Sequence, residues 1–119
     1  MKNHESNLQQ GCISWFNLQY PQYYGLLFAV PNGGKRNIVT ATIQKREGVI
    51  SGVADLIFLV PRNGFHGLCI EMKYGNGKQS ENQKIWQEKI TRQGYAYVVC
   101  NSVESFMFTI NYYLNAKVS

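Results

Sequence analysis

The sequence predicts an α/β domain with a mixed central β-sheet flanked by helices on both faces. Two observations lead to this prediction. Helical and strand-like apolar patterns alternate along the chain in the order αβαββαβα, and the two consecutive strands in the middle are joined by a short turn. A chain of 119 residues has room for one hydrophobic core, so we expect a single domain over residues 1–119.

The first half of the chain predicts a helix, a strand and a second helix, over residues 5–20, 25–30 and 37–47. Pro21 ends the first helix, and the turn-forming residues 31–34 end the strand. Gly48 closes the second, basic helix as its C′ residue. Three residues of this second helix are expected to face inward: Ile38, Ala41 and Thr42.

The second half predicts three strands and two helices. The strands cover residues 55–60, 68–74 and 95–100. Ser80 caps a helix that Gly94 ends, and Gln83 lies three residues after the cap, where its side chain can complete a capping box. Ser102 caps a last helix that runs to about Asn115.

Three charged residues on the two central strands carry the strongest functional signal. Glu71 and Lys73 lie two positions apart, so they share one face of their strand while Ile70 and Met72 take the other. Asp55 opens the preceding strand. Charges on a strand that is otherwise apolar are costly unless they are paired or used. Two carboxylates are the hard oxygen ligands that Mg²⁺ or Mn²⁺ prefers, which points to metal-dependent phosphodiester hydrolysis.

The length of the turn decides whether the two carboxylates meet. A two-residue turn at 63–64 would place Asp55 opposite Met72, on the face away from Glu71. A three-residue loop at 62–64 with its glycine in the left-handed region pairs Asp55 with Glu71 instead. We therefore expect the three-residue loop, and a bulge would restore the same register.

Simpler explanations of these residues stay open. Glu71 and Lys73 could also form a same-face ion pair on an exposed edge strand, and such a pair contributes little to stability. Asp55 also suits a turn residue that begins a strand. The net charge of +5 favours a polyanionic partner such as nucleic acid, and by itself it is weak evidence.

Composition narrows the cellular setting. The longest apolar run spans about six residues, whereas a membrane span needs roughly 20, so no membrane partner is expected. No secretory signal pattern opens the chain. Cys12, Cys69 and Cys100 have no metal-binding spacing, and the last two fall in strands, where a free thiol acts as a small apolar side chain. We expect a reducing cytoplasm, that of a bacterium or of a phage's host.

The run Gly52-Val53-Ala54-Asp55, followed by Ile70-Glu71-Met72-Lys73, resembles the PD-(D/E)xK nuclease core, with Ala54 in place of the usual proline. Four further features occur in the same order as in one branch of that superfamily: Glu5, residues 30–34, Gly48-Val49, and Ser80-x-x-Gln83-x-x-Trp86. Over residues 5–100 the chain therefore resembles the VRR-NUC family, the virus-type replication-repair nucleases. The resemblance implies a restriction-endonuclease-like core.

The resemblance also implies roles for individual residues. The expected ligands of Mg²⁺ or Mn²⁺ are the carboxylates of Asp55 and Glu71 and the backbone carbonyl of Met72. Lys73 corresponds to the catalytic lysine, and Gln83 to a glutamine that reaches the site from the following helix. Glu5 corresponds to a helical glutamate that holds a water or a second metal. Gln83 equally suits its capping box, and Glu5 suits a favourable first-turn charge.

Six residues are expected to contact DNA, branched or duplex: Asn32, Gly33, Lys35, Arg36, Lys78 and Lys84. Lysine and arginine contacts to phosphates would position a duplex without reading its sequence. The glycine of the loop at 32–34 could let DNA backbone approach, and an ordinary connection between a strand and a helix explains it equally well.

Together with the resemblance, these features lead us to expect a Mg²⁺- or Mn²⁺-dependent DNA endonuclease of the VRR-NUC branch that selects a structure, such as a four-way junction or flap. So small a domain leaves little surface for base readout, which is consistent with recognition of shape. An exonuclease or restriction-like nuclease is one rival. A catalytically silent DNA-binding module of the same fold is another. The last helix carries apolar residues on more than one side: Phe106, Phe108, Ile110, Tyr112 and Tyr113. Core packing accounts for most of them, and the surplus suggests a homodimer surface.

Overall fold

The computed structural model describes residues 4–31 and 38–115. Its elements follow the predicted order, with one short 3₁₀ helix added: α1 His4–Gln19, η1 Pro21–Tyr23, β1 Leu27–Ala29, α2 Ile38–Arg46, β2 Leu56–Phe58, β3 Leu68–Met72, α3 Glu81–Arg92, β4 Ala96–Cys100 and α4 Val103–Asn115. No helix in the described ranges is both long enough and apolar enough to cross a bilayer.

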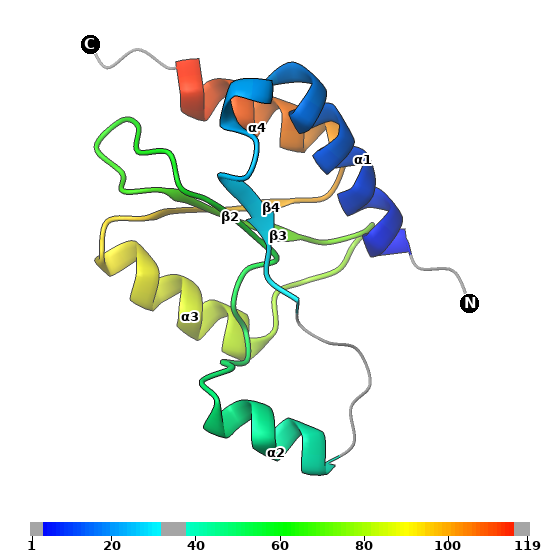
Figure 1. Cartoon of the computed structure of the whole chain (residues 1–119), viewed down its shortest axis with the longest axis vertical. Coiled ribbons are helices and arrows are strands. Elements are labelled where there is room, and N and C mark those ends of the chain that lie inside the picture. Colours follow the sequence, from blue (N-terminus) through cyan, green and yellow to red (C-terminus); the bar gives the residue numbers. More distant parts are fainter. Residues whose placement is uncertain (1–3, 32–37, 116–119) are drawn as a thin grey trace.

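The four strands form one mixed sheet in the order β1-β2-β3-β4. The β1–β2 and β2–β3 pairs are antiparallel, and the β3–β4 pair is parallel. Helices α1 and α4 lie together over one face of the sheet, and α3 lies on the other (Figure 1). The predicted architecture, a mixed sheet with helices on both faces, is confirmed.

The hydrophobic core fills the space between the sheet and the α1/α4 layer. Its fully buried residues include Phe16 of α1, Phe58 of β2 and Phe106 of α4. The rings of Phe16 and Phe58 meet edge to face with centroids 5.3 Å apart. Burying a side chain of this kind stabilises the fold by about 1.5–3 kcal/mol. All three cysteines are free and buried.

Helix α2 differs from its prediction. None of its side chains is buried, and Ile38, which was expected to face inward with Ala41 and Thr42, is 84% exposed. Thr42 is exposed as well, and its hydroxyl donates to the Ile38 carbonyl (2.8 Å). The apolar side chains of α2 do not form one stripe along the helix, so no single face can be buried. In Figure 1 the helix lies beyond the end of the sheet, next to the start of α3.

The β2–β3 hairpin has the predicted register but not the predicted turn. Leu56 pairs with Ile70, which sets Asp55 opposite Glu71. At the tip, however, Arg62 bridges directly to Phe65, and the two residues between them have φ values of 54° and 83°.

The expected three-residue loop is therefore wrong, because Asn63-Gly64 forms the two-residue turn that an Asn-Gly pair favours. The pairing at the tip is one residue out of step with the pairing of β2 and β3. The irregular stretch between them restores the register, as a bulge would. Burial of Leu56 and Phe58 on the core face fixes that register more strongly than the turn does.

Candidate active site

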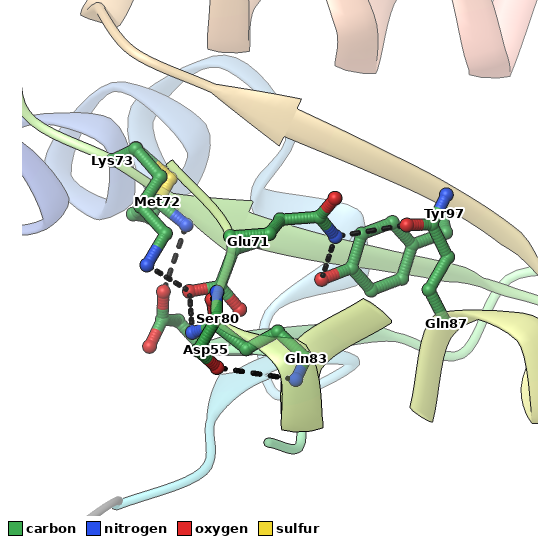
Figure 2. A network of polar contacts seen from close by, with 9 residues as sticks. Asp55, Glu71, Met72, Lys73, Ser80, Gln83, Gln87 and Tyr97 are labelled. Carbon is green, nitrogen blue, oxygen red and sulfur yellow. Dashed lines mark hydrogen bonds and ion pairs between the residues drawn. The ribbon is translucent and has the colours of Figure 1, made fainter. Parts of the chain in front are cut away.

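Asp55 and Glu71 meet on the face of the sheet that α3 covers. Glu71 lies in β3 and is only 2% exposed, and Asp55 comes directly before β2. The backbone N–H of Met72 donates to Oδ2 of Asp55 at 2.7 Å and so orients this carboxylate. Figure 2 shows Asp55, Glu71 and Lys73 converging from the two strands, with Gln83 reaching them from α3. The structure thus brings together five of the predicted site residues: Asp55, Glu71, Met72, Lys73 and Gln83.

The two carboxylate oxygens of Glu71 have different surroundings. Oε2 accepts a hydrogen bond from Nε2 of Gln83 at 2.7 Å and lies 3.6 Å from Nζ of Lys73. Oε1 is buried and has no hydrogen-bond partner within the described part of the chain. A buried acceptor without a partner costs about 1–3 kcal/mol. A cation bound between the two carboxylates would remove this cost.

The electrostatics of the pair are unfavourable without a cation. Burial, followed by the negative charge of Asp55, raises the pKa of Glu71 to about 8, and the nearby Lys73 ammonium opposes this shift. A divalent ion beside both groups favours their ionised forms and reverses this effect.

Gln83 fulfils both roles that its sequence position suggested. Its backbone N–H donates to Oγ of Ser80 (3.2 Å), and its Oε1 accepts from the Ser80 N–H (2.8 Å), which completes the capping box. The same amide donates to Glu71 through Nε2. A side-chain amide can accept at the cap and donate to a carboxylate at once, whereas an ionised glutamate can only accept, so glutamine fits this position better than glutamate.

Gly52 determines how closely α3 approaches the sheet. Its φ is +90°, and a Cβ added there would lie 2.5 Å from the carbonyl carbon and oxygen of Asn82. The Asn82 side chain donates to Oγ of Ser51 at 3.1 Å. Gly52 belongs to the motif that the sequence singled out, and the structure adds a close contact with the first turn of α3, which carries Gln83.

A second polar cluster, which the sequence did not indicate, lies beside the site. Nε2 of Gln79 donates to Oε1 of Gln87 (2.8 Å) and to the hydroxyl of Tyr97 (3.2 Å). Burial raises the pKa of Tyr97 to about 12. These bonds tie the segment before Ser80 to β4 and to the middle of α3 (Figure 2). The one sequence signal for this cluster is the alternation along β4, which places Tyr97 opposite Cys69 and so on the same face of the sheet as Glu71.

The remaining predicted residues lie at the edges of the site or outside the described residues. Glu5 is exposed in the first turn of α1, where neighbouring His4 stacks on Tyr74 with ring centroids 4.5 Å apart. In residues 4–31 and 38–115, no three or more His, Cys, Asp or Glu side chains form a metal-binding group, so Glu5 is not grouped with Asp55 and Glu71. Its role stays a prediction.

Of the residues expected to contact DNA, Lys78 and Lys84 are exposed near the start of α3. The other four, Asn32, Gly33, Lys35 and Arg36, lie outside the described residues.

Comparison with known proteins identifies the family of this chain. The family model of the VRR-NUC domain matches residues 3–104. A solved structure described as "VRR_NUC domain protein" superimposes with a TM-score of 0.83 at 27% sequence identity, covering 96% of this chain and 90% of that one. No curated protein matches the sequence. The family match spans most of the chain, and the fold is consistent with a restriction-endonuclease-like core. The chain therefore belongs to the VRR-NUC family, which implies a nuclease of the PD-(D/E)xK superfamily.

Proposed function

We propose that this protein is a Mg²⁺- or Mn²⁺-dependent DNA endonuclease that selects a DNA structure, a four-way junction or a flap. One observation carries the proposal. Two carboxylates meet across β2 and β3 beside a lysine, and one of their oxygens, Oε1 of Glu71, is buried without a partner among the described residues. A divalent cation between the two carboxylates would satisfy this acceptor.

The residues present fit a divalent metal. Asp55 and Glu71 offer carboxylate oxygens, and the carbonyl of Met72 is the third expected ligand. When bound, the ion would polarise a phosphoryl oxygen and lower the pKa of a bound water. PD-(D/E)xK nucleases use divalent metals, so the choice between Mg²⁺ and Mn²⁺ is the finer part of the proposal.

The position of Lys73 supports its proposed role. Its side chain is 14% exposed, and its Nζ lies 3.6 Å from Oε2 of Glu71. The ammonium is thus held at the edge of the carboxylate pair, where it can orient an attacking water or stabilise the charge that develops on the phosphate. Gln83 keeps the Glu71 carboxylate in place by its own hydrogen bond.

Two features support DNA of a particular shape as the substrate. The net charge is +5, and Lys78 and Lys84 are exposed beside the site, where they can contact phosphates. Phosphate contacts position DNA without reading bases, which suits recognition of a branch rather than a sequence. Exonucleolytic cleavage is the second candidate, because the same carboxylates and lysine can serve it.

We also propose that two copies associate through α4. Phe108 and Tyr112 are 69% and 64% exposed, and their rings stack with centroids 5.8 Å apart. Two copies of this chain could cut both arms of a junction. Size-exclusion chromatography with light scattering tests the association, and a monomer at micromolar concentration would overturn it.

The central test is cleavage of labelled four-way junction, flap, linear duplex and single strand with Mg²⁺ or Mn²⁺. We expect metal-dependent cutting of the branched substrates, lost in Lys73→Ala and in Glu71→Gln. Cutting that persists in both variants would refute the assigned site. Calorimetry with Mn²⁺ separates a silent metal-free module from a nuclease, because binding should be present in the native protein and lost in Asp55→Asn.

A further inference from the structure

A pocket of about 450 Å³ opens directly beside the candidate active site. It lies between α2 and the beginning of α3, with the segment 49–53 between them. Among the side chains that line it are Ala41, Gln44 and Lys45 from α2, Val49 and Ile50 from the connecting segment, and Gln83 from α3. Ligand pockets in proteins have volumes of roughly 300–1,000 Å³, so this one can hold a small group.

The pocket and the catalytic carboxylates share one side chain. Gln83 lines the pocket and donates to Oε2 of Glu71 at 2.7 Å. Gln83 therefore links the pocket to Glu71. A DNA strand whose phosphate lay at the carboxylates would bring its adjoining nucleotide to the mouth of the pocket.

The chemistry of the lining suits a nucleobase. Val49 and Ile50 are 41% and 58% exposed and offer apolar surface to a flat ring. Gln44 also lines the pocket, and its Oε1 is buried with no hydrogen-bond partner in the described ranges, so a rotation of its side-chain amide would offer this acceptor to a base N–H. Lys45 supplies positive charge for a phosphate. Enzymes that take up single bases recognise them through hydrogen bonds to the base edge and through apolar packing.

We propose that this pocket binds one unpaired nucleobase adjoining the scissile phosphate. The proposal rests on the nuclease function proposed above and adds a reason for structure selectivity. A base inside a continuous duplex is stacked and paired, so its entry into the pocket costs unpairing energy. A base at a flap or junction branch point is already free of its partner. The pocket thus favours cleavage at branches without reading a sequence.

The test uses a flap with a normal nucleotide at the branch and the same flap with an abasic residue there. Ala41→Trp fills the pocket, and Val39→Trp is its control, because Val39 is on the same helix, is 67% exposed and is not among the lining residues. We expect Ala41→Trp to lower kcat/KM on the normal flap by about tenfold or more, as loss of one pocket contact does, and Val39→Trp to have little effect. The kcat/KM of the native protein should be lower on the abasic flap than on the normal flap by a similar factor. On the abasic flap, Ala41→Trp should lower kcat/KM no further.

Equal cleavage of the two flaps by the native protein, or equal effects of the two tryptophan variants, would overturn the pocket while leaving the nuclease intact. Absence of cleavage on every substrate would refute the proposed nuclease function instead. A binding measurement without metal tests the pocket in that case as well. A flap with 2-aminopurine at the branch should change its fluorescence on binding, and Gln44→Leu should diminish the change. An unchanged signal in Gln44→Leu and Ala41→Trp would overturn the pocket.

Discussion

The two faces of the central sheet are built on opposite principles, although they share the strand β3. On the face covered by α1 and α4, Leu68, Ile70 and Met72 belong to an apolar core rich in aromatic rings. On the face covered by α3, Glu71 is buried among polar groups, and no side chain of α3 is buried. One strand therefore supplies packing to one side and chemistry to the other.

The difference shows where the stability of the protein comes from. The core face buries enough apolar area to offset the cost of a buried, partly unsatisfied carboxylate on the other face. On the site face, hydrogen bonds fix the orientation of the side chains but add little to the free energy of unfolding. Substitutions on the two faces should accordingly separate stability from activity.

The largest effect is expected on the core face. Phe58→Ala should lower the free energy of unfolding by about 3–5 kcal/mol, because it leaves a cavity among rings that cannot close over it. Urea denaturation followed by circular dichroism measures the change. Val99→Ala, in β4, is the control on the other face, since Val99 pairs with Glu71 and is 43% exposed. Similar losses for both would contradict the division between the faces.

The contact between Gly52 and α3 comes next. Gly52→Ala and Gly48→Ala both place an alanine at positive φ, but only the first forces a Cβ to within 2.5 Å of backbone atoms. Gly52→Ala should therefore destabilise the protein by about 1–3 kcal/mol more than Gly48→Ala. Thermal denaturation compares the two variants. Cleavage should also fall further in Gly52→Ala, because Gln83 moves away from Glu71 with the start of α3. Equal behaviour would mean that α3 adjusts freely.

The capping box offers a smaller and sharper comparison. Ser80→Ala and Gln83→Ala each remove half of the box, so each should lower the free energy of unfolding by about 1 kcal/mol. Only Gln83→Ala also removes the donor to Glu71. Its cleavage rate should fall about 10- to 100-fold, as for other residues that orient metal ligands, while Ser80→Ala keeps most of its activity. Parallel losses of activity in the two variants would indicate that the cap alone matters.

The smallest effect on stability is expected at the exposed lysines. Lys78→Ala and Lys84→Ala should change the free energy of unfolding by less than about 0.5 kcal/mol. Each should reduce the slope of log binding constant against log salt concentration by about 1 if it contacts a phosphate. Lys89, on the exposed side of α3, is the matched control. Titrations of labelled junction at several salt concentrations provide the slopes, and unchanged slopes would remove these lysines from the interface.

The elements with a clear periodic pattern could be predicted from the sequence. Alternation in residues 68–74 placed Glu71 and Lys73 on one face, and the spacing of Ser80 and Gln83 predicted the capping box. The turn was predicted wrongly, because pairing of Asp55 with Glu71 does not require a three-residue loop: Asn63-Gly64 forms a two-residue turn, and the irregular stretch behind it restores the register. Helix α2 was assigned an inner face, although its apolar residues do not share a stripe.

Other parts of the site depend on contacts between distant segments and have no local signal. The approach of α3 to Gly52 becomes visible only when residue 52 and residue 82 are brought together. The same holds for the bond between Gln79 and Tyr97, which lie 18 residues apart. The buried Oε1 of Glu71 is likewise a property of the packed protein rather than of β3 alone.

The capping box of α3 also links the integrity of the site to local opening of a helix end. The backbone N–H of Gln83 is protected from exchange by its bond to Oγ of Ser80, and the backbone N–H of Lys84 by its bond to the Ser80 carbonyl (3.1 Å). Because no α3 side chain is buried, the first turn can open at a free energy well below that of global unfolding. Each opening would also release Gln83 from Glu71. Hydrogen exchange at these two amides therefore measures how often the site is dismantled while the rest of the protein stays folded.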